Sequence, residues 1–455
     1  MLGDSATPVA LFTIGAVLWR AQQHAHSRTP LREFLPVALV KLFERWGIAS
    51  DIQGRIVQAP AGVPVGSLVA KGEVELGFQQ LSELMNLPGI EVLGPARADI
   101  GSPGYNGLAA IYGNDAAYGG GMDILTFQNS VHALARLFST DASHAVQMSG
   151  NFASHAGGAA YLRPYNSLFS GPGAAVLCAY DFRIEDNAAP EGAAIYDDSN
   201  ADGLGNQVGG SIALNTDPYF DFGETHNFCT LTEPPTALGA VACAAGMPCN
   251  TIAGNKAEDG SGNPTAGSTI LLQTDGDLEG DRFSMRANTG AHALREIGDN
   301  LYTKANLTNC LLADNVLTQE LIAQTDGNSA YTMLDSCTIA GNTIGAPYAL
   351  LVPGYMYLAN SIIDQPGRAT VDPAITDSTQ AVHVLSNDRS TLPDTAYIQQ
   401  GQPSFVDAAN GDYHLLPTSL GVDDAPVEPA TIATRLDLDR KPRVVDLPAV
   451  PNSFG

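Results

Sequence analysis

Oxygen-bearing side chains alternate in two short runs that each lead to a glycine, and these residues are the best suited to chemistry. The runs contain Asp198, Asn200 and Asp202 in DSNADG, and Asp275, Asp277 and Glu279 in DGDLEGD. An EF-hand loop places its calcium ligands at alternate positions in this way. The twelfth position of the first run is Gly209, so the bidentate Glu of an EF-hand is missing. The runs predict calcium as a cofactor, and solvated acidic loops are the alternative.

Catalytic residues do not emerge from the same search. Glycan-cleaving enzymes need paired carboxylates, or calcium with a basic residue. Polygalacturonase-like hydrolases carry NTD, DD, GHG and RIK in that order, whereas this chain has DD at 197–198 before NTD at 215–217 and lacks the other two motifs. The basic candidates for a lyase lie beside acidic residues, as surface ion pairs also do, and they are Arg183, Arg282 and Arg286. Catalytic residues stay unassigned, and a non-catalytic protein is favoured.

The cysteines predict one short loop closure. Cys229, Cys243 and Cys249 fall in the insertion FCTLTEPPTALGAVACAAGMPCN, where a disulfide between Cys243 and Cys249 could hold a loop that lacks a core of its own. Cys310 and Cys337 are predicted to be reduced, as small buried apolar residues. No two cysteines form a CxxC pair, which argues against structural zinc.

An internal repeat positions many of these residues. NLTNCLLADNVL (306–317) aligns with MLDSCTIAGNTI (333–344) at a constant offset of 27 residues, which matches Cys310 with Cys337 and Asn315 with Asn342. Earlier copies keep an apolar residue that is followed five positions later by Asn. They are Phe182 with Asn187, Phe283 with Asn288, and a weaker copy that ends at Asn151.

The repeat predicts a mainly β fold, namely a right-handed parallel β-helix. Apolar positions two residues apart indicate strands, and a period in the twenties to thirties indicates one coil of a solenoid. Residues of successive coils would then stack in register about 4.8 Å apart. The repeated Asn would lie at a tight bend, where its amide can bond backbone groups and the next Asn. A β-sandwich with coincidental repeats is the alternative.

Residues 98–455 resemble the secreted and cell-surface right-handed β-helix proteins of bacteria. The resemblance rests on FRIEDNAAPEGAAIY (182–196), on SCTIAGNTI, and on QPSFVDAANGDYHLLPTSLGVDD (402–424), which is typical of the segment that closes such helices. It implies an extracellular or outer-surface location and a polysaccharide or cell-surface ligand. A monomer is expected.

The charge distribution separates residues 1–97 from the rest of the 455-residue chain. The first 97 residues hold 8 Lys or Arg and 8 Asp or Glu, so the whole net charge of −26 lies after them. Both tryptophans lie before this boundary and all six cysteines lie after it. A charge of this sign repels phosphate, so nucleic acid is excluded as a partner.

Residues 1–42 are predicted to form an apolar helical fragment. Between Asp4 and Arg20 there are 15 uncharged positions, fewer than the roughly 20 that a bilayer span needs, so no stable membrane span is expected. The leading residues contain an acid and no Lys or Arg, unlike a secretory signal peptide. MLGDSATPVALFTIGAVLWRAQQHAHSRTPLREFLPVALVKL resembles one helix, and the start of the next, of the auxin efflux carrier family.

Residues 43–97 are predicted to form a small α/β fragment. GRIVQAP and GIEVLGP are strand-like, and VGSLVAKGE and QQLSELMN are helix-like, an order that predicts a parallel α/β unit. VPVGSLVAKGEVELGFQQLSELMNLPGIEVLGP resembles the periplasmic molybdate-type solute-binding family, whose fold closes two lobes around an oxyanion. Gln79, Gln80 and Ser82 match positions of that family and are equally suited to turns and caps. We interpret the chain as a mosaic of two transport-related fragments and a β-helix.

Three function classes follow from these patterns. The favoured one is a non-catalytic secreted or surface β-helix that presents an extended face to glycans or other cell-surface ligands. A polysaccharide lyase or glycoside hydrolase of the same fold is the first alternative. Oxyanion binding linked to transport through the N-terminal fragment is the second.

Overall fold

The computed structural model describes the chain in two compact units, Met1–Ser102 and Pro103–Gly455. The described residues are 67–68, 71, 98–100, 110–125, 133–137, 145–163, 175–198, 210–214, 250–273, 276–297, 303–326, 330–393, 397–422 and 437–439. In the first unit they include β1 (Ala98–Ile100). The apolar helical fragment predicted for 1–42 lies outside the described residues, as does nearly all of the α/β fragment predicted for 43–97.

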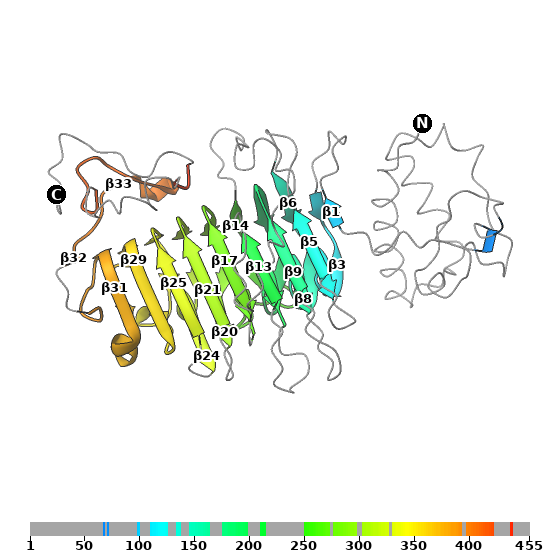
Figure 1. Ribbon diagram of the computed structural model, residues 1–455, viewed down its shortest axis with the longest axis horizontal. Coiled ribbons are helices and arrows are strands. Elements are labelled where there is room, and N and C mark those ends of the chain that lie inside the picture. Colours follow the sequence, from blue (N-terminus) through cyan, green and yellow to red (C-terminus); the bar gives the residue numbers. More distant parts are fainter. Residues whose placement is uncertain are drawn as a thin grey trace. The chain divides into compact units, whose positions relative to one another are not determined.

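The second unit is mainly β, and the strands of its three stacked sheets run parallel, which confirms the fold class at that level (Figure 1). The chain passes through a large sheet, a second sheet and a third sheet, and then returns to the large sheet beside its previous pass. We call one such pass a coil. Each coil contributes two consecutive strands to the large sheet, so this sheet has two rows of strands.

Strands of the first row of the large sheet pair with one another in chain order. They are β5 (Ala133–Leu137), β9 (Ala175–Ala179), β13 (Gly210–Leu214), β17 (Asp277–Asp281), β21 (Thr303–Thr308), β25 (Ala330–Asp335), β29 (Tyr355–Asp364) and β31 (Thr379–Ser386). The second row pairs in the same way and is joined by the later parts of β29 and β31. It contains β2 (Ala110–Tyr112), β6 (Val146–Ser149), β10 (Phe182–Glu185), β14 (Thr251–Ala253), β18 (Ser284–Arg286), β22 (Leu311–Ala313), β26 (Thr338–Ala340) and β32 (Ile398–Gln400).

The second sheet is built from very short strands that follow the second row. They are β3 (Asp115–Tyr118), β7 (Phe152–Ala156), β11 (Ala188–Ala189), β15 (Lys256–Ala257), β19 (Thr289–Gly290), β23 (Val316–Leu317) and β27 (Thr343–Ile344). The third sheet completes each coil. It contains β4 (Met122–Leu125), β8 (Ala160–Arg163), β12 (Ile195–Asp197), β16 (Ser268–Leu272), β20 (His292–Ile297), β24 (Ile322–Asp326), β28 (Tyr348–Leu351) and β30 (Ala369–Val371).

Single left-handed residues make the two sharpest bends of a coil. The bend into the second sheet has φ between +53° and +67° at residues that include Gly150, Ala287, Asp314 and Gly341. The bend between the two rows of the large sheet has positive φ at residues such as Asn309 (50°) and Ser336 (63°). Glycine, Asn and Asp tolerate this region best, which explains why they are frequent at these two positions.

An Asn follows each left-handed residue at the bend into the second sheet, and these side chains bond from coil to coil. Asn288 donates its backbone N–H and its Nδ2 to Oδ1 of Asn315, at 3.0 and 2.9 Å. Asn315 donates Nδ2 in turn to Oδ1 of Asn342, at 2.8 Å. The column consists of Asn114, Asn151, Asn187, Asn255, Asn288, Asn315 and Asn342. The bends therefore leave few buried polar backbone groups without a partner.

Inside the coils, buried side chains of successive strands lie on one another. Phe182 and Phe283 are both buried, with exposures of 1% and 0%, but they are not neighbours, because Phe182 pairs in register with Val146 and β14 lies between β10 and β18. Leu312 pairs in register with Ile339, and Asn315 is fully buried beside them. Because each inward side chain contacts the coils on both sides of it, the core is a set of stacked rows along one axis.

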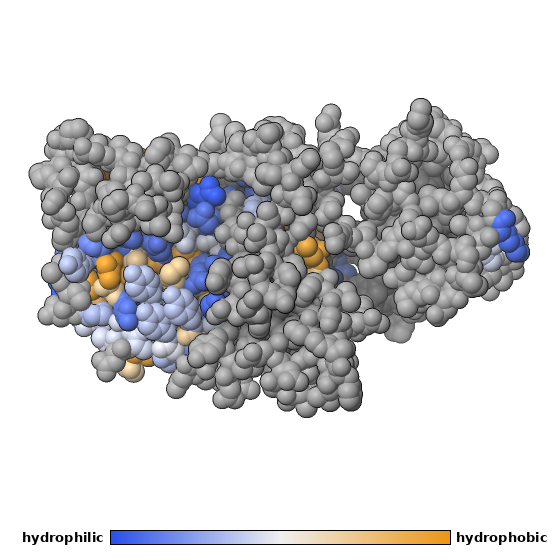
Figure 2. Space-filling view, in the orientation of Figure 1, coloured by the Kyte–Doolittle hydropathy of each residue, from blue (hydrophilic) through white to orange (hydrophobic). Residues whose placement is uncertain are grey.

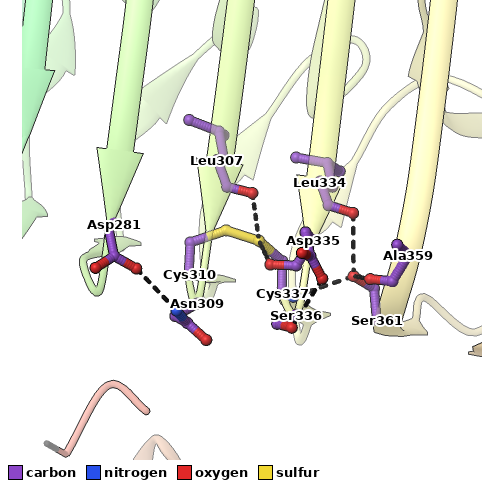
Figure 3. Close-up of a disulfide and its surroundings, with 10 residues drawn as sticks. All are labelled: Asp281, Leu307, Asn309, Cys310, Leu334, Asp335, Ser336, Cys337, Ala359 and Ser361. Atoms are coloured by element: carbon purple, nitrogen blue, oxygen red, sulfur yellow. Dashed lines mark hydrogen bonds between the residues drawn. A yellow bond between two sulfur atoms is a disulfide. The ribbon is translucent and has the colours of Figure 1, made fainter. Parts of the chain in front are cut away.

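Cys310 and Cys337 form a disulfide, so the prediction that they are reduced is wrong (Figure 3). The pairing of β22 with β26 in register places the two Cα atoms 4.6 Å apart, which lies within the range that a disulfide spans. Parallel stacking thus brought them close enough to bond. The disulfide predicted between Cys243 and Cys249 lies outside the described residues.

Coil lengths vary more than the sequence repeat indicated. The steps between consecutive Asn residues of the column are 37, 36, 68, 33, 27 and 27 residues. The period of 27 therefore holds for the last two steps, whereas the step from Asn187 to Asn255 contains a long insertion. Strand pairing is unaffected, because β10 still pairs directly with β14.

After β32 the chain folds back over the second row of the large sheet (Figure 1). We call residues 404–422 the strap. The strap contains β33 (Phe405–Asp407), a 3₁₀ turn at Ala408–Asn410, and β34 (Asp412–Leu415). Another 3₁₀ turn, Pro373–Ser378, lies outside the strap and precedes β31. Tyr413 donates its hydroxyl hydrogen to Asp314, and Arg286 donates to the other oxygen of Asp314 at 2.6 Å. A cavity of about 160 Å³ remains beneath the strap, lined in part by Ile362 and Leu385.

Candidate functional site

The predicted calcium ligands are not assembled into one site by the described residues. Asp198 accepts a hydrogen bond from the Tyr161 hydroxyl. Asn200, Asp202 and Asp275 lie outside the described residues. Within the described ranges, no group of three or more His, Cys, Asp or Glu side chains is arranged to hold a metal ion. The structure does bring Asp277 and Glu279 together, on β17.

The three predicted basic candidates are all engaged by acids. Arg183 pairs with Glu185 at 2.7 Å, Arg282 with Asp281 at 2.7 Å, and Arg286 with Asp314 at 2.6 Å. All three ion pairs are half-buried, and each ties neighbouring strand or bend residues together. This arrangement matches the alternative of structural ion pairs.

The outward side of the first row of the large sheet gathers several reactive groups. On β17, half-buried Asp277 and Glu279 alternate with buried residues, so both carboxyls point away from the core. Register places Lys304 beside Asp277 and Asn306 beside Glu279, and then Tyr331 beside Lys304. We call this group the acidic–tyrosine face, and it consists of Asp277, Glu279, Lys304, Asn306, Tyr331, Tyr355 and Tyr357.

The tyrosines form the later half of this face. The rings of Tyr331 and Tyr355 stack with their centroids 5.1 Å apart and an angle of 5° between planes. Tyr357 lies two residues beyond Tyr355 on the same outward side of β29. All three tyrosines are partly exposed. Figure 2 shows weakly hydrophilic side chains over β25 and β29 on this face, with strongly hydrophilic ones beside them.

Burial weakens the acidity of both carboxyls, and repulsion by Glu279 adds to this effect at Asp277. Burial, together with the nearby charge of Glu279, raises the pKa of Asp277 to about 7, although Lys304 opposes this shift. The pKa of Glu279 is also raised, chiefly by burial, while the amide of Asn306 and the charge of Lys304 act in the other direction. Asn306 donates Nδ2 to Oε1 of Glu279 at 2.6 Å. A proton can therefore reside on Asp277 near neutral pH.

Two acceptor atoms on this face have no hydrogen-bond donor. Oδ1 of Asp277 and Oδ1 of Asn306 are buried, and neither has a partner in the described part of the protein. They lie on adjacent strands, since Asp277 and Asn306 belong to β17 and β21. An unpartnered buried polar group costs about 1–3 kcal/mol. A ligand that supplies donors at this place would recover that free energy.

Sequence reasoning found Asp277 and Glu279 but missed the other members of the face. The offset of 27 that aligns Cys310 with Cys337 also aligns Asp277 with Lys304, and Lys304 with Tyr331. Extending the repeat backwards by one strand would therefore have found them. The second row of the same sheet does not present an open outward side at its later coils, because the strap covers Ile362 and Leu385 there.

Comparison with known proteins concerns the beginning of the chain. A family model for bacterial extracellular solute-binding proteins matches residues 35–117. Aconitate isomerase from Pseudomonas sp. is 47% identical over 53 residues, which are 12% of this chain and 20% of that enzyme. The chain thus spans about a fifth of the length of this curated relative. No solved structure matches the chain. The solute-binding resemblance predicted for 43–97 is confirmed at the level of this broad family, and the segment that is similar to it is wider, from 35 to 117.

Proposed function

We propose that this protein is a secreted or cell-surface right-handed parallel β-helix that binds glycans, without cleaving them, on the acidic–tyrosine face. The coil-by-coil register, the Asn column and the left-handed bends support the β-helix. The extracellular family that matches residues 35–117 supports a location outside the cytoplasm. Among the described residues, no helix is long and apolar enough to cross a membrane.

The two unpartnered acceptors, Asp277 Oδ1 and Asn306 Oδ1, are the observation that carries this proposal. Glycans present many hydroxyl donors at short spacing, so they suit buried acceptors that lack donors. Tyrosine hydroxyls farther along the face, at Tyr331, Tyr355 and Tyr357, can donate to and accept from further sugar units. The parallel strands supply the same geometry at every coil, which fits an extended polymer.

Binding of the full chain to an array of immobilised polysaccharides tests the proposal. We expect at least one polysaccharide to be retained, and we expect the double variant Asp277→Ala/Asn306→Ala to lose about tenfold in affinity or more. Asp412→Ala removes a carboxyl of the strap whose side chain is 41% exposed, and as the matched control it should bind like the wild type. Retention that is equal in the double variant would place binding elsewhere, and no retention at all would reject it.

Glycan cleavage is the second candidate, and the carboxyl pair favours it. Asp277 and Glu279 are two residues apart on one strand, so their Cα atoms are separated by roughly 6.7 Å. The raised pKa of Asp277, about 7, suits a general acid. If cleavage occurs, new reducing ends or unsaturated products will appear from a bound polysaccharide and will disappear with Asp277→Asn.

Solute binding is the third candidate, supported by the family match over residues 35–117. The relative that matches 53 residues is named for aconitate, a small carboxylate. Calorimetric titration of the full chain with molybdate and with aconitate tests this function. Heat that saturates with either anion would support it, and its absence with both would reject it.

Calcium remains proposed for the run that contains Asp198, Asn200 and Asp202. At the second run, the positive charge of Lys304 beside Asp277 and Glu279 disfavours a divalent cation. Titration with CaCl2 should therefore give a signal that Asp198→Ala reduces and Asp277→Ala does not.

A further inference from the structure

The acids of the acidic–tyrosine face exceed the cations that face them. Asp277 and Glu279 carry two negative charges when ionised, and Lys304 is the cation that acts on both. Lys304 forms no ion pair within the part of the chain that the structure describes. Arg282, the next cation along the strand, is bonded to Asp281 at 2.7 Å. One negative charge is therefore uncompensated when both carboxyls are ionised.

Two of the unpartnered atoms on this face can only accept, which narrows the chemistry of the missing group; the third, the Ser211 hydroxyl in register with Asp277, can both donate and accept. An ionised carboxylate accepts hydrogen bonds only, and an amide oxygen likewise accepts only. Glu279 already accepts from the amide of Asn306 at 2.6 Å, so the remaining demand lies at Asp277 Oδ1 and Asn306 Oδ1. An ammonium group offers three donors, no acceptor and one positive charge. It satisfies both the hydrogen bonds and the charge, whereas a hydroxyl group satisfies the hydrogen bonds alone.

A metal ion fits the same place less well. Calcium takes six to eight oxygen ligands, several of them carboxylates. The described residues bring no third acid into a metal-binding group with Asp277 and Glu279. A divalent ion would also lie close to Lys304, whose strand is adjacent in register.

We propose that the acidic–tyrosine face selects glycans that carry a free amino group, and that Asp277 Oδ1 and Asn306 Oδ1 accept hydrogen bonds from the ammonium. This inference rests on the proposed glycan binding. The ligand class is a hexosamine-containing glycan whose amine is not acetylated. Tyrosine hydroxyls on β25 and β29 bond the sugar hydroxyls of neighbouring units. The hydrogen bonds to a charged donor are the part that distinguishes this ligand from a neutral glycan.

Three oligosaccharides of equal length test this inference by calorimetry on the full chain at pH 7, namely oligomers of glucosamine, of N-acetylglucosamine and of glucose. We expect the glucosamine oligomer to bind about tenfold to a hundredfold more tightly than the other two. Asp277→Asn should remove this preference. Asp281→Asn is the matched control. It removes the same charge four residues further along β17, from a carboxylate that Arg282 already neutralises. Asp281→Asn should keep the preference. Nonspecific attraction of the acidic protein for the cationic oligomer falls equally in both variants, so it does not account for a difference between them.

The outcomes separate this inference from the proposal on which it rests. Equal affinity for the three sugars, or an equal loss in both variants, overturns the amine preference and leaves glycan binding in place. No binding of any sugar, here and on the polysaccharide array, overturns both. Displacement of the glucosamine oligomer by an equal concentration of CaCl2 would identify a metal site and overturn the amine assignment. Circular dichroism of the two variants, matched to the wild type, shows that each is folded.

Discussion

Removing one amide from the middle of the Asn column should destabilise the coils on both sides of it. The side chain of Asn315 is fully buried and takes part in four hydrogen bonds. Its Oδ1 accepts from the backbone N–H and the Nδ2 of Asn288, and its Nδ2 donates to the carbonyl of Met285 and to Asn342. Asn315→Ala deletes all four and leaves the N–H of Asn288 and the carbonyl of Met285 without these partners.

The size of the effect follows from those groups. Each buried hydrogen bond contributes about 1 kcal/mol net, and a buried group left without a partner costs about 1–3 kcal/mol. We therefore expect Asn315→Ala to lower the free energy of unfolding by about 4 kcal/mol. Asn114, at the first described end of the column, donates one side-chain hydrogen bond, to Asn151 at 2.9 Å. Asn114→Ala should cost about 1 kcal/mol, and it serves as the control for loss of an amide alone.

Two measurements check this prediction. Urea unfolding followed by circular dichroism gives the change in the free energy of unfolding. Because coils contact only their neighbours, hydrogen exchange should show the loss concentrated in β18, β22 and β26. A cost for Asn315→Ala that is no larger than that of Asn114→Ala would refute the reasoning, as would faster exchange spread evenly over all coils.

Other features of the fold give three more predictions. Burial raises the pKa of Glu296 to about 8, so the fold favours the protonated form of this side chain. The resulting contribution to stability is complete below the ordinary pKa of 4.5 and is lost as the pH rises to 8. Glu296→Gln should remove up to about 5 kcal/mol of this pH dependence, measured by urea unfolding between pH 4 and 9, and an unchanged slope would contradict it. Reduction of the Cys310–Cys337 disulfide should cost about 3 kcal/mol in the same assay, whereas thiols that react with an alkylating agent before reduction would show that no disulfide exists. Tyr413→Phe should cost about 1 kcal/mol and speed exchange in the strap, because the hydrogen bond to Asp314 is lost, and unchanged exchange there would argue against this anchor.

The sequence predicted the parts of the fold that repeat locally. Asn187, Asn288, Asn315 and Asn342 were found from spacing, because the left-handed bend and the amide that follows it need the same residue types in every coil. Asn255 was not found. Its distance from Asn187 is 68 residues, and an alignment at a fixed offset cannot cross an insertion of that size.

Other features depended on distances that spacing alone does not give. The repeat predicted that Cys310 lies over Cys337. The prediction that both cysteines are reduced did not take into account that this stacking places their Cα atoms 4.6 Å apart, close enough for a disulfide. The candidate site was half found for a related reason. Asp277 and Glu279 were visible as an acidic run, whereas Asn306 acquires its meaning only from being one coil away from them.

The inward and outward rows of one strand are under different constraints, and this difference explains where the candidate site lies. Inward, Leu278 stacks on Ala305 and Ala305 on Thr332, small or apolar residues that must fill the space left by the coils above and below. Outward, the same register runs from Asp277 to Lys304 and on to Tyr331, so the residue type changes at both steps, and Tyr331 then lies beside Tyr355. Outward residues can change type from coil to coil without disturbing the core, because solvent or a ligand completes their surroundings. A polymer that lies along this row therefore meets an acid, a cation and a tyrosine in fixed order at intervals of about 4.8 Å, which gives the face a direction along the axis.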